Sequence, residues 1–126
     1  GLRGVGASSG MRFIAGSHCS PPIQQFQHER GEKRGTASDD TVLGWARESN
    51  PEARIVELAA GVGEAVLFDG RTWHASINDG DAPERLALLL QFAAADVPVR
   101  IPDMAHLRWP FAYLDRPRPP VIAVHG

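Results

Sequence analysis

The chain has 126 residues, 43% of them hydrophobic, and its 13 Lys and Arg against 15 Asp and Glu give a formal net charge of −2. A domain of this length can bury a real core. The near-balance of charge, without a basic stripe, argues against binding to nucleic acid or to an anionic membrane surface, and the apolar runs are too short to cross a membrane. Cys19 is the single cysteine, so no internal disulfide can form and a reducing, cytoplasmic compartment is expected.

Glycine and proline punctuate the chain between short apolar runs, with 13 Gly and 10 Pro in total. This composition favours many short strands over long helices. The sequence opens without Met on a glycine-rich stretch over residues 1–6, as though it were cut from something longer. The first predicted strand covers residues 11–15 and ends at Gly16-Ser17-His18.

Residues 19–53 are the least regular part of the sequence, because a glutamine-rich stretch is followed by charged residues and then by Ser and Asp. We expect an irregular, exposed loop insertion here, with one helical turn over residues 41–47 that Asp40 would cap. Trp45 is an isolated aromatic residue in this segment. Local packing is a more common role for such a residue than the lining of a pocket.

Regular patterns return after the insertion. Short apolar segments between Gly and Asp turns predict four strands, over residues 54–59, 64–68, 72–77 and 85–92. Strands spaced about ten residues apart indicate an all-β sandwich or barrel.

The C-terminal part has a different composition. From Pro98 onward the chain carries six of the ten prolines, which predicts a mostly extended tail. We therefore expect a β domain over residues 1–97 and a Pro-rich tail over residues 98–126 that packs on it.

Polar residues alternate along one of the predicted strands. In a strand, His74 and Ser76 share a face, and a hairpin turn at residues 79–80 would place Arg85 opposite His74, with Cβ atoms about 5 Å apart. A neutral imidazole is a good ligand for Fe(II), an arginine fork matches a carboxylate, and a serine hydroxyl can add a hydrogen bond. An exposed edge strand shows the same alternation, so the spacing alone leaves a structural role open for each residue.

Two segments resemble the phytanoyl-CoA dioxygenase family. Residues 9–18 are similar to a family stretch that ends in Pro-Gly-Ser-His, with Ala15 in place of the usual proline. Residues 63–78, followed by Arg85, resemble a second family block with spaced Phe, His, Ser and Asn. The resemblance is colinear over residues 9–93, about two-thirds of the chain.

This resemblance implies an Fe(II)- and 2-oxoglutarate-dependent dioxygenase built on a double-stranded β-helix, a cupin-like jelly roll. By position, His74 would be the distal iron ligand, Arg85 would hold the far carboxylate of 2-oxoglutarate, and Ser76 would assist Arg85. The implied reaction uses O2, decarboxylates 2-oxoglutarate to succinate and oxidises a small organic substrate, with hydroxylation expected. The sequence does not distinguish hydroxylation from desaturation or halogenation. It also does not indicate the substrate or the oligomeric state.

The sequence departs from the family in one respect, because it contains no His-x-Asp or His-x-Glu. In the family that motif precedes the first block, so we expect a truncated oxygenase, inactive alone, with the motif roughly 15 to 40 residues before Gly1. The remaining histidines are expected to have no ligand role, and Cys19 is not expected to be a nucleophile. These histidines are His18, His28, His106 and His125.

Two other interpretations stay open. The first is a non-catalytic β-sandwich module of the same fold that binds a ligand or partner without a metal. The second is a cupin-like metal-binding barrel or isomerase, which fits less well because such proteins usually group several His ligands and this sequence has one in a suitable place.

Overall fold

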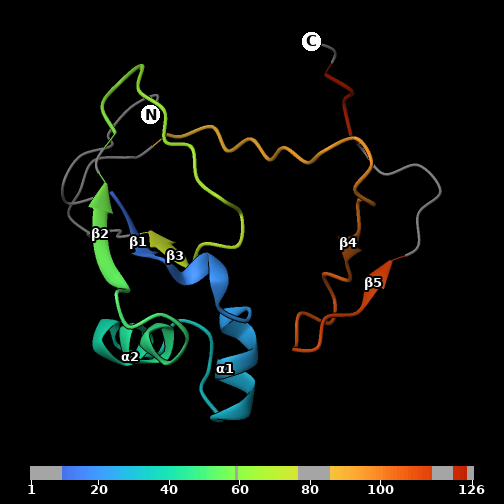
Figure 1. The fold of residues 1–126 in the computed structure, drawn as a ribbon. Coiled ribbons are helices and arrows are strands. Elements are labelled where there is room, and N and C mark those ends of the chain that lie inside the picture. Colours follow the sequence, from blue (N-terminus) through green and yellow to red (C-terminus); the bar gives the residue numbers. More distant parts are fainter. Residues whose placement is uncertain (1–9, 59, 77–85, 115–120, 125–126) are drawn as a thin grey trace. The chain divides into compact units, whose positions relative to one another are not determined.

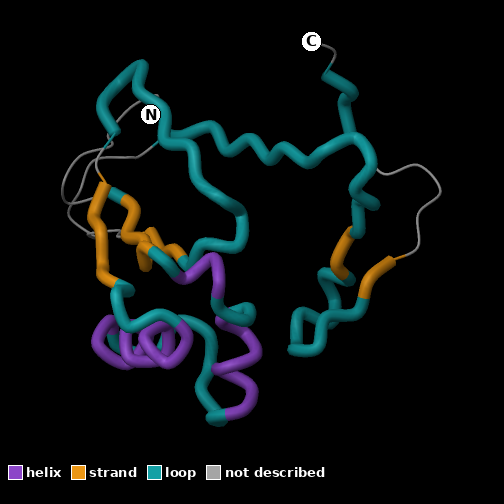
Figure 2. Tube along the Cα trace, viewed as in Figure 1, coloured by secondary structure: helices purple, strands orange, loops and turns teal. Residues whose placement is uncertain are grey.

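A computed structural model describes residues 10–58, 60–76, 86–114 and 121–124 of the chain (Figures 1 and 2). The chain forms two compact units, Gly1–Leu89 and Leu90–Gly126. The first unit holds the helices and a three-stranded sheet, and the second holds a two-stranded sheet. The predicted division at residues 97 and 98 remains a prediction.

The sheet of the first unit is antiparallel and has the order β2-β1-β3. Its strands are β1 (Met11–Ala15), β2 (Arg54–Leu58) and β3 (His74–Ser76). In the central strand, Phe13 lies opposite Val56 of β2 on one side and His74 of β3 on the other. The first two strands confirm the prediction, and β3 begins two residues later than predicted. The antiparallel sheets are compatible with a β-rich fold.

One face of this sheet is covered by the helices α1 (Ile23–Glu29) and α2 (Asp39–Ser49), which Figure 1 shows on the same side of the strands. The core between them consists of buried residues from both helices, from the sheet and from the segments beside its strands: Ile14, Phe26, Trp45, Ala46, Ala53 and Trp73. The rings of Phe26 and Trp45 stack with centroids 6.1 Å apart. Burial of each large apolar side chain contributes about 1.5–3 kcal/mol, so the helices are part of the core that holds the sheet.

The prediction of an irregular insertion over residues 19–53 was therefore wrong. In α2, Val42, Trp45 and Ala46 recur at the three- and four-residue spacing that places side chains on one helix face. The charged composition of this segment belongs to the exposed faces and obscured that pattern. The helix also begins earlier than predicted, since its cap is Ser38 and not Asp40: the Ser38 side chain accepts a hydrogen bond from Thr41 N at 3.2 Å.

Two of the predicted strands are not strands in the described part of the chain. Residues 64–68 are exposed apart from Phe68, and residues 87–92 are exposed and irregular. The apolar residues of the second segment include Leu88 at 71% and Phe92 at 73% exposure. Strand propensity depends on a neighbouring strand and a buried face, and the described sheets offer neither segment a ladder.

The second unit contains β4 (Ile101–Pro102) and β5 (Tyr113–Leu114), which pair in antiparallel fashion. Between them, the rings of Trp109 and Phe111 meet edge to face at 5.6 Å. None of the helices among the described residues is long and apolar enough to cross a membrane.

Candidate functional site

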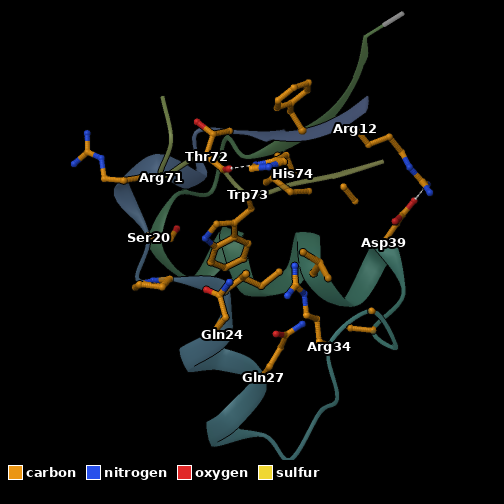
Figure 3. Close-up of a pocket in the computed structure, with 18 of the residues that line it drawn as sticks. Arg12, Ser20, Gln24, Gln27, Arg34, Asp39, Arg71, Thr72, Trp73 and His74 are labelled. Carbon is orange, nitrogen blue, oxygen red and sulfur yellow. Dashed lines mark hydrogen bonds and ion pairs between the residues drawn. The ribbon is translucent and has the colours of Figure 1, made fainter. Parts of the chain in front are cut away.

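A cavity of about 860 Å³ lies along β3 and the residues that lead into it (Figure 3). Residues 70–76 line it consecutively, together with α1 and the segment that precedes α2. β3 is an edge strand, because it pairs with β1 on one side and none of the strands in the described ranges pairs with its other side. Arg12 and Arg34 also line the cavity. Arg12 forms an ion pair with Asp39, another residue of the cavity lining.

His74 is exposed and lies on the sheet face opposite to the helices. Its sequence neighbour Trp73 is buried in the helix-covered core at 4% exposure, and adjacent strand residues point to opposite faces. The His74 ring contacts two phenylalanines, with centroids 4.9 Å from Phe68 and 6.0 Å from Phe13. Phe13 and Phe68 meet each other at 4.8 Å. The imidazole is therefore packed on an aromatic pair while one edge stays accessible.

One nitrogen of the His74 ring is already bonded. Nδ1 lies 2.8 Å from the backbone oxygen of Thr72, the contact drawn as a dashed line in Figure 3. A carbonyl oxygen only accepts hydrogen bonds, so Nδ1 carries the proton and Nε2 of the neutral ring keeps its lone pair. Histidines that bind metals commonly donate their other N–H to a carbonyl or carboxylate in this way. The ring is therefore in a tautomer suited to ligation.

The connection between β1 and β3 passes through Ser17, a fully buried side chain at 0% exposure. The strands share one direct bond here, from Ile14 N to Trp73 O at 2.9 Å. The reciprocal bond is replaced by the serine hydroxyl, which accepts from Trp73 N at 2.8 Å and donates to Ile14 O at 2.6 Å. The Trp73 indole is fixed as well, since Nε1 donates to Pro21 O at 3.1 Å.

The local fold that delivers Ser17 depends on Gly16. After β1 ends at Ala15, Gly16 adopts a left-handed backbone with φ of 89°, and residues Ser17–Cys19 form a 3₁₀ turn. This conformation is readily available to glycine and rarely to other residues. The reversal carries Ser17 back beside β1, where it reaches both strands.

The structure places only part of the predicted site. Ser76 lies opposite Met11 in the sheet. It follows His74 by two residues in β3, so His74 and Ser76 belong to the same face of the sheet. Arg85 and the predicted turn at residues 79–80 lie outside the described residues, as does His125. The predicted pairing of His74 with Arg85 therefore remains a prediction.

The donors in the described part of the chain fit one position of an iron site and not a complete site. His74 offers a free Nε2, but no group of three or more His, Cys, Asp or Glu side chains there is arranged to hold a metal ion. Elsewhere, His106 pairs with Asp103 at 2.9 Å and lowers the pKa of that carboxyl group. No catalytic step through a metal follows from these residues alone.

An exposed ion pair borders the cavity. The Asp69 carboxylate accepts hydrogen bonds from Arg71 Nη2 and from the backbone N of Arg71, both at 2.8 Å. These bonds from Arg71 hold the pKa of Asp69 far below its usual range. Asp69 is therefore ionised at any ordinary working pH.

Sequence reasoning missed Ser17 and Phe68 as parts of this site. Both lie in the segments quoted for the family resemblance, and a serine beside a glycine at the end of a predicted strand was the available signal. Their roles depend on contacts over long sequence separations, 56 residues in the case of Ser17 and Trp73.

A family model described as phytanoyl-CoA dioxygenase (PhyH) matches residues 7–82 of the chain. The match includes β1, both helices, β2 and β3. Neither the curated proteins nor the solved structures contain a significant match to the chain.

Proposed function

Since the chain belongs to the phytanoyl-CoA dioxygenase family, we propose that it is part of an Fe(II)- and 2-oxoglutarate-dependent dioxygenase that oxidises a small organic substrate. Membership of the family supports a dioxygenase lineage. It also supports iron as the cofactor and 2-oxoglutarate and O2 as the co-substrates. Hydroxylation coupled to the decarboxylation of 2-oxoglutarate to succinate is the proposed reaction. The proposed complete fold is a double-stranded β-helix, to which the β2-β1-β3 sheet would contribute three strands.

The observation that carries this proposal is the state of His74. Its Nδ1–H is engaged by Thr72 O, its Nε2 has no hydrogen-bond partner among the described residues, and its ring is supported by Phe13 and Phe68. A surface histidine without a ligand role needs no such preorganisation. We propose Nε2 of His74 as one iron ligand, with the other ligands supplied by residues outside the described part of the chain.

Arg85 and Ser76 complete the proposed site. The guanidinium of Arg85 would neutralise and orient the far carboxylate of 2-oxoglutarate through a two-pronged hydrogen bond, and the hydroxyl of Ser76 would add a third bond from the face that it shares with His74. Iron, when bound, would supply the activation of O2. The protein residues would orient the co-substrate and keep competing reactions away from it.

The test compares two preparations under identical conditions. The first is the 126-residue chain, and the second is the longest natural polypeptide that contains it. Each is titrated anaerobically with Fe(II) and 2-oxoglutarate, the visible charge-transfer band is recorded, and succinate release is then measured in air. The chain alone should give neither signal, because one imidazole does not retain iron against water and buffer.

The longer preparation should give both signals, and His74→Ala should abolish them. His28→Ala is the matched control, since it removes an exposed imidazole from the end of α1 and should leave both signals unchanged. A band from the 126-residue chain would show that this chain supplies the remaining ligands and would contradict the truncated site. Full turnover in His74→Ala would contradict the assignment of His74. Specific ligand binding without any metal dependence would instead favour the non-catalytic module.

A further inference from the structure

Ser17 is joined to His74 by a short series of hydrogen bonds that includes one peptide group. Its hydroxyl donates to Ile14 O and accepts from Trp73 N. The N–H of Trp73 belongs to the same peptide unit as the carbonyl of Thr72. That carbonyl is the group that accepts the hydrogen bond from His74 Nδ1.

The peptide group transmits orientation because it is planar and trans. Its N–H and its C=O point in opposite directions from one rigid plane. Once Ser17 fixes the direction of the Trp73 N–H, the direction of the Thr72 carbonyl is fixed as well. The bond from Trp73 N to Ser17 is buried and the bond from His74 Nδ1 to Thr72 O is exposed. Hydrogen bonds that share a peptide group polarise each other.

Other contacts hold Trp73 without touching the Thr72–Trp73 peptide, so they do not replace Ser17. The Trp73 carbonyl accepts from Ile14 N and the indole donates to Pro21 O, so the tryptophan is anchored on its C-terminal side and at its ring. Among the described residues, the hydroxyl of Ser17 is the partner of the Trp73 N–H. Without it, this N–H would have no hydrogen-bond partner among the described residues, and the peptide would keep its bond to His74.

We propose that Ser17 is a positioning residue that sets the tautomer and the ring orientation of His74 through the Thr72–Trp73 peptide. This inference deepens the proposed function and rests on it, because the tautomer matters for catalysis only if His74 is a metal ligand. With Nδ1 protonated, Nε2 presents a lone pair. In the other tautomer, Nε2 carries the proton and cannot bind a metal until the ring rearranges.

The experiment reads the tautomer directly and needs no metal. Long-range ¹H–¹⁵N correlation spectra of the full chain are recorded above pH 8, where an imidazole of ordinary pKa is neutral. The chain has five histidines, and the signal that disappears in His74→Gln identifies the relevant ring. The unsubstituted chain should show the Nδ1–H form of His74.

Ser17→Ala should move the tautomer ratio of His74 toward the Nε2–H form by about fivefold, the effect of losing one ordinary hydrogen bond. Ser17→Thr keeps the hydroxyl and should restore the original ratio. Ser20→Ala is the matched control, because the Ser20 hydroxyl has no hydrogen-bond partner among the described residues. It should leave the ratio unchanged.

An unchanged ratio in folded Ser17→Ala, or a dominant Nε2–H form in the unsubstituted chain, would overturn the proposal. If Ser17→Ala does not fold, the spectrum of the unsubstituted chain decides. The tautomer ratio is measured without iron. A shift in Ser17→Ala together with a failure of the longer preparation to bind iron would therefore support the role of Ser17 and contradict only the proposed function.

Discussion

The side-chain amide of Asn50 fills the space in which a side chain at Gly16 would lie. Asn50 Nδ2 is 3.5 Å from the backbone oxygen of Gly16, across 34 positions of sequence. A Cβ atom added at Gly16 would overlap this amide. The turn that delivers Ser17 to β3 is therefore constrained by the end of α2 as well as by its own backbone.

Gly16→Ala should destabilise the fold by about 1–3 kcal/mol, because alanine meets both a left-handed φ and the Asn50 amide. Chemical denaturation monitored by tryptophan fluorescence measures the change. Gly35→Ala is the control, since Gly35 has a φ of 79° and no described residue lies within 4 Å of the added carbon. Equal losses in the two variants would show that the Asn50 contact is unimportant.

Ser38→Ala should cost about 1 kcal/mol, because it removes the side-chain bond that caps the first turn of α2. The loss should appear as a lower midpoint of thermal unfolding and as reduced helical circular dichroism. Ser49→Ala makes the same chemical change at the other end of the helix, where no cap is lost. A loss of the same size there would argue against the capping role.

Gly44→Ala should stabilise the chain by about 0.5–1 kcal/mol. Gly44 lies inside α2 and is exposed, and an added carbon would meet no atom of the described part of the chain within 4 Å. Glycine in a helix loses more backbone entropy on folding than alanine does. A decrease in the unfolding midpoint would show that this side of the helix is covered in solution.

Asp69→Asn should change how stability depends on pH in the acid range. Hydrogen bonds from Arg71 depress the folded-state pKa of Asp69, so the stabilisation is present above the unfolded pKa of about 3.9 and is lost as the pH falls below it. The difference between the parent chain and Asp69→Asn should therefore shrink below about pH 4.

This ion pair is exposed, so its effect should be small and should weaken further in high salt. Denaturation midpoints between pH 2 and 7, at low and high salt, provide the measurement. A difference that persists unchanged at the acid limit would mean that Asp69 acts through something other than its charge.

Arg85→Ala should raise the 2-oxoglutarate concentration needed for half-maximal succinate release by tens to hundreds of fold, corresponding to about 2–4 kcal/mol for a lost charge-assisted pair. Arg85→Lys should be intermediate, because lysine keeps the charge but not the two-pronged geometry. The assay uses the longer preparation described above. An unaltered requirement for 2-oxoglutarate in Arg85→Ala would remove Arg85 from the proposed site.

Local sequence patterns determined the strands at residues 11–15 and 54–58 and the position of His74 in a strand, because alternation and turn residues act over a few positions. The Gly-Ser-His segment and the block that ends at Asn78 also identified the family. Composition led to the wrong prediction of an irregular insertion over residues 19–53, because the charged residues on the exposed helix faces hid the helical spacing of Trp45 and its apolar neighbours. It misled again in the predicted strand over residues 85–92, whose mostly apolar composition suggested a strand that the described sheets do not contain.

Only the tertiary structure decided which groups act on His74. The fully buried Ser17, the aromatic support from Phe13 and Phe68, and the hydrogen bond to Thr72 O depend on how β1 and β3 pair. Hydrogen bonds and ring contacts form between groups that are close in space. Ser17 and Trp73 are brought together by folding across 56 residues, a relationship that no periodicity in one segment encodes.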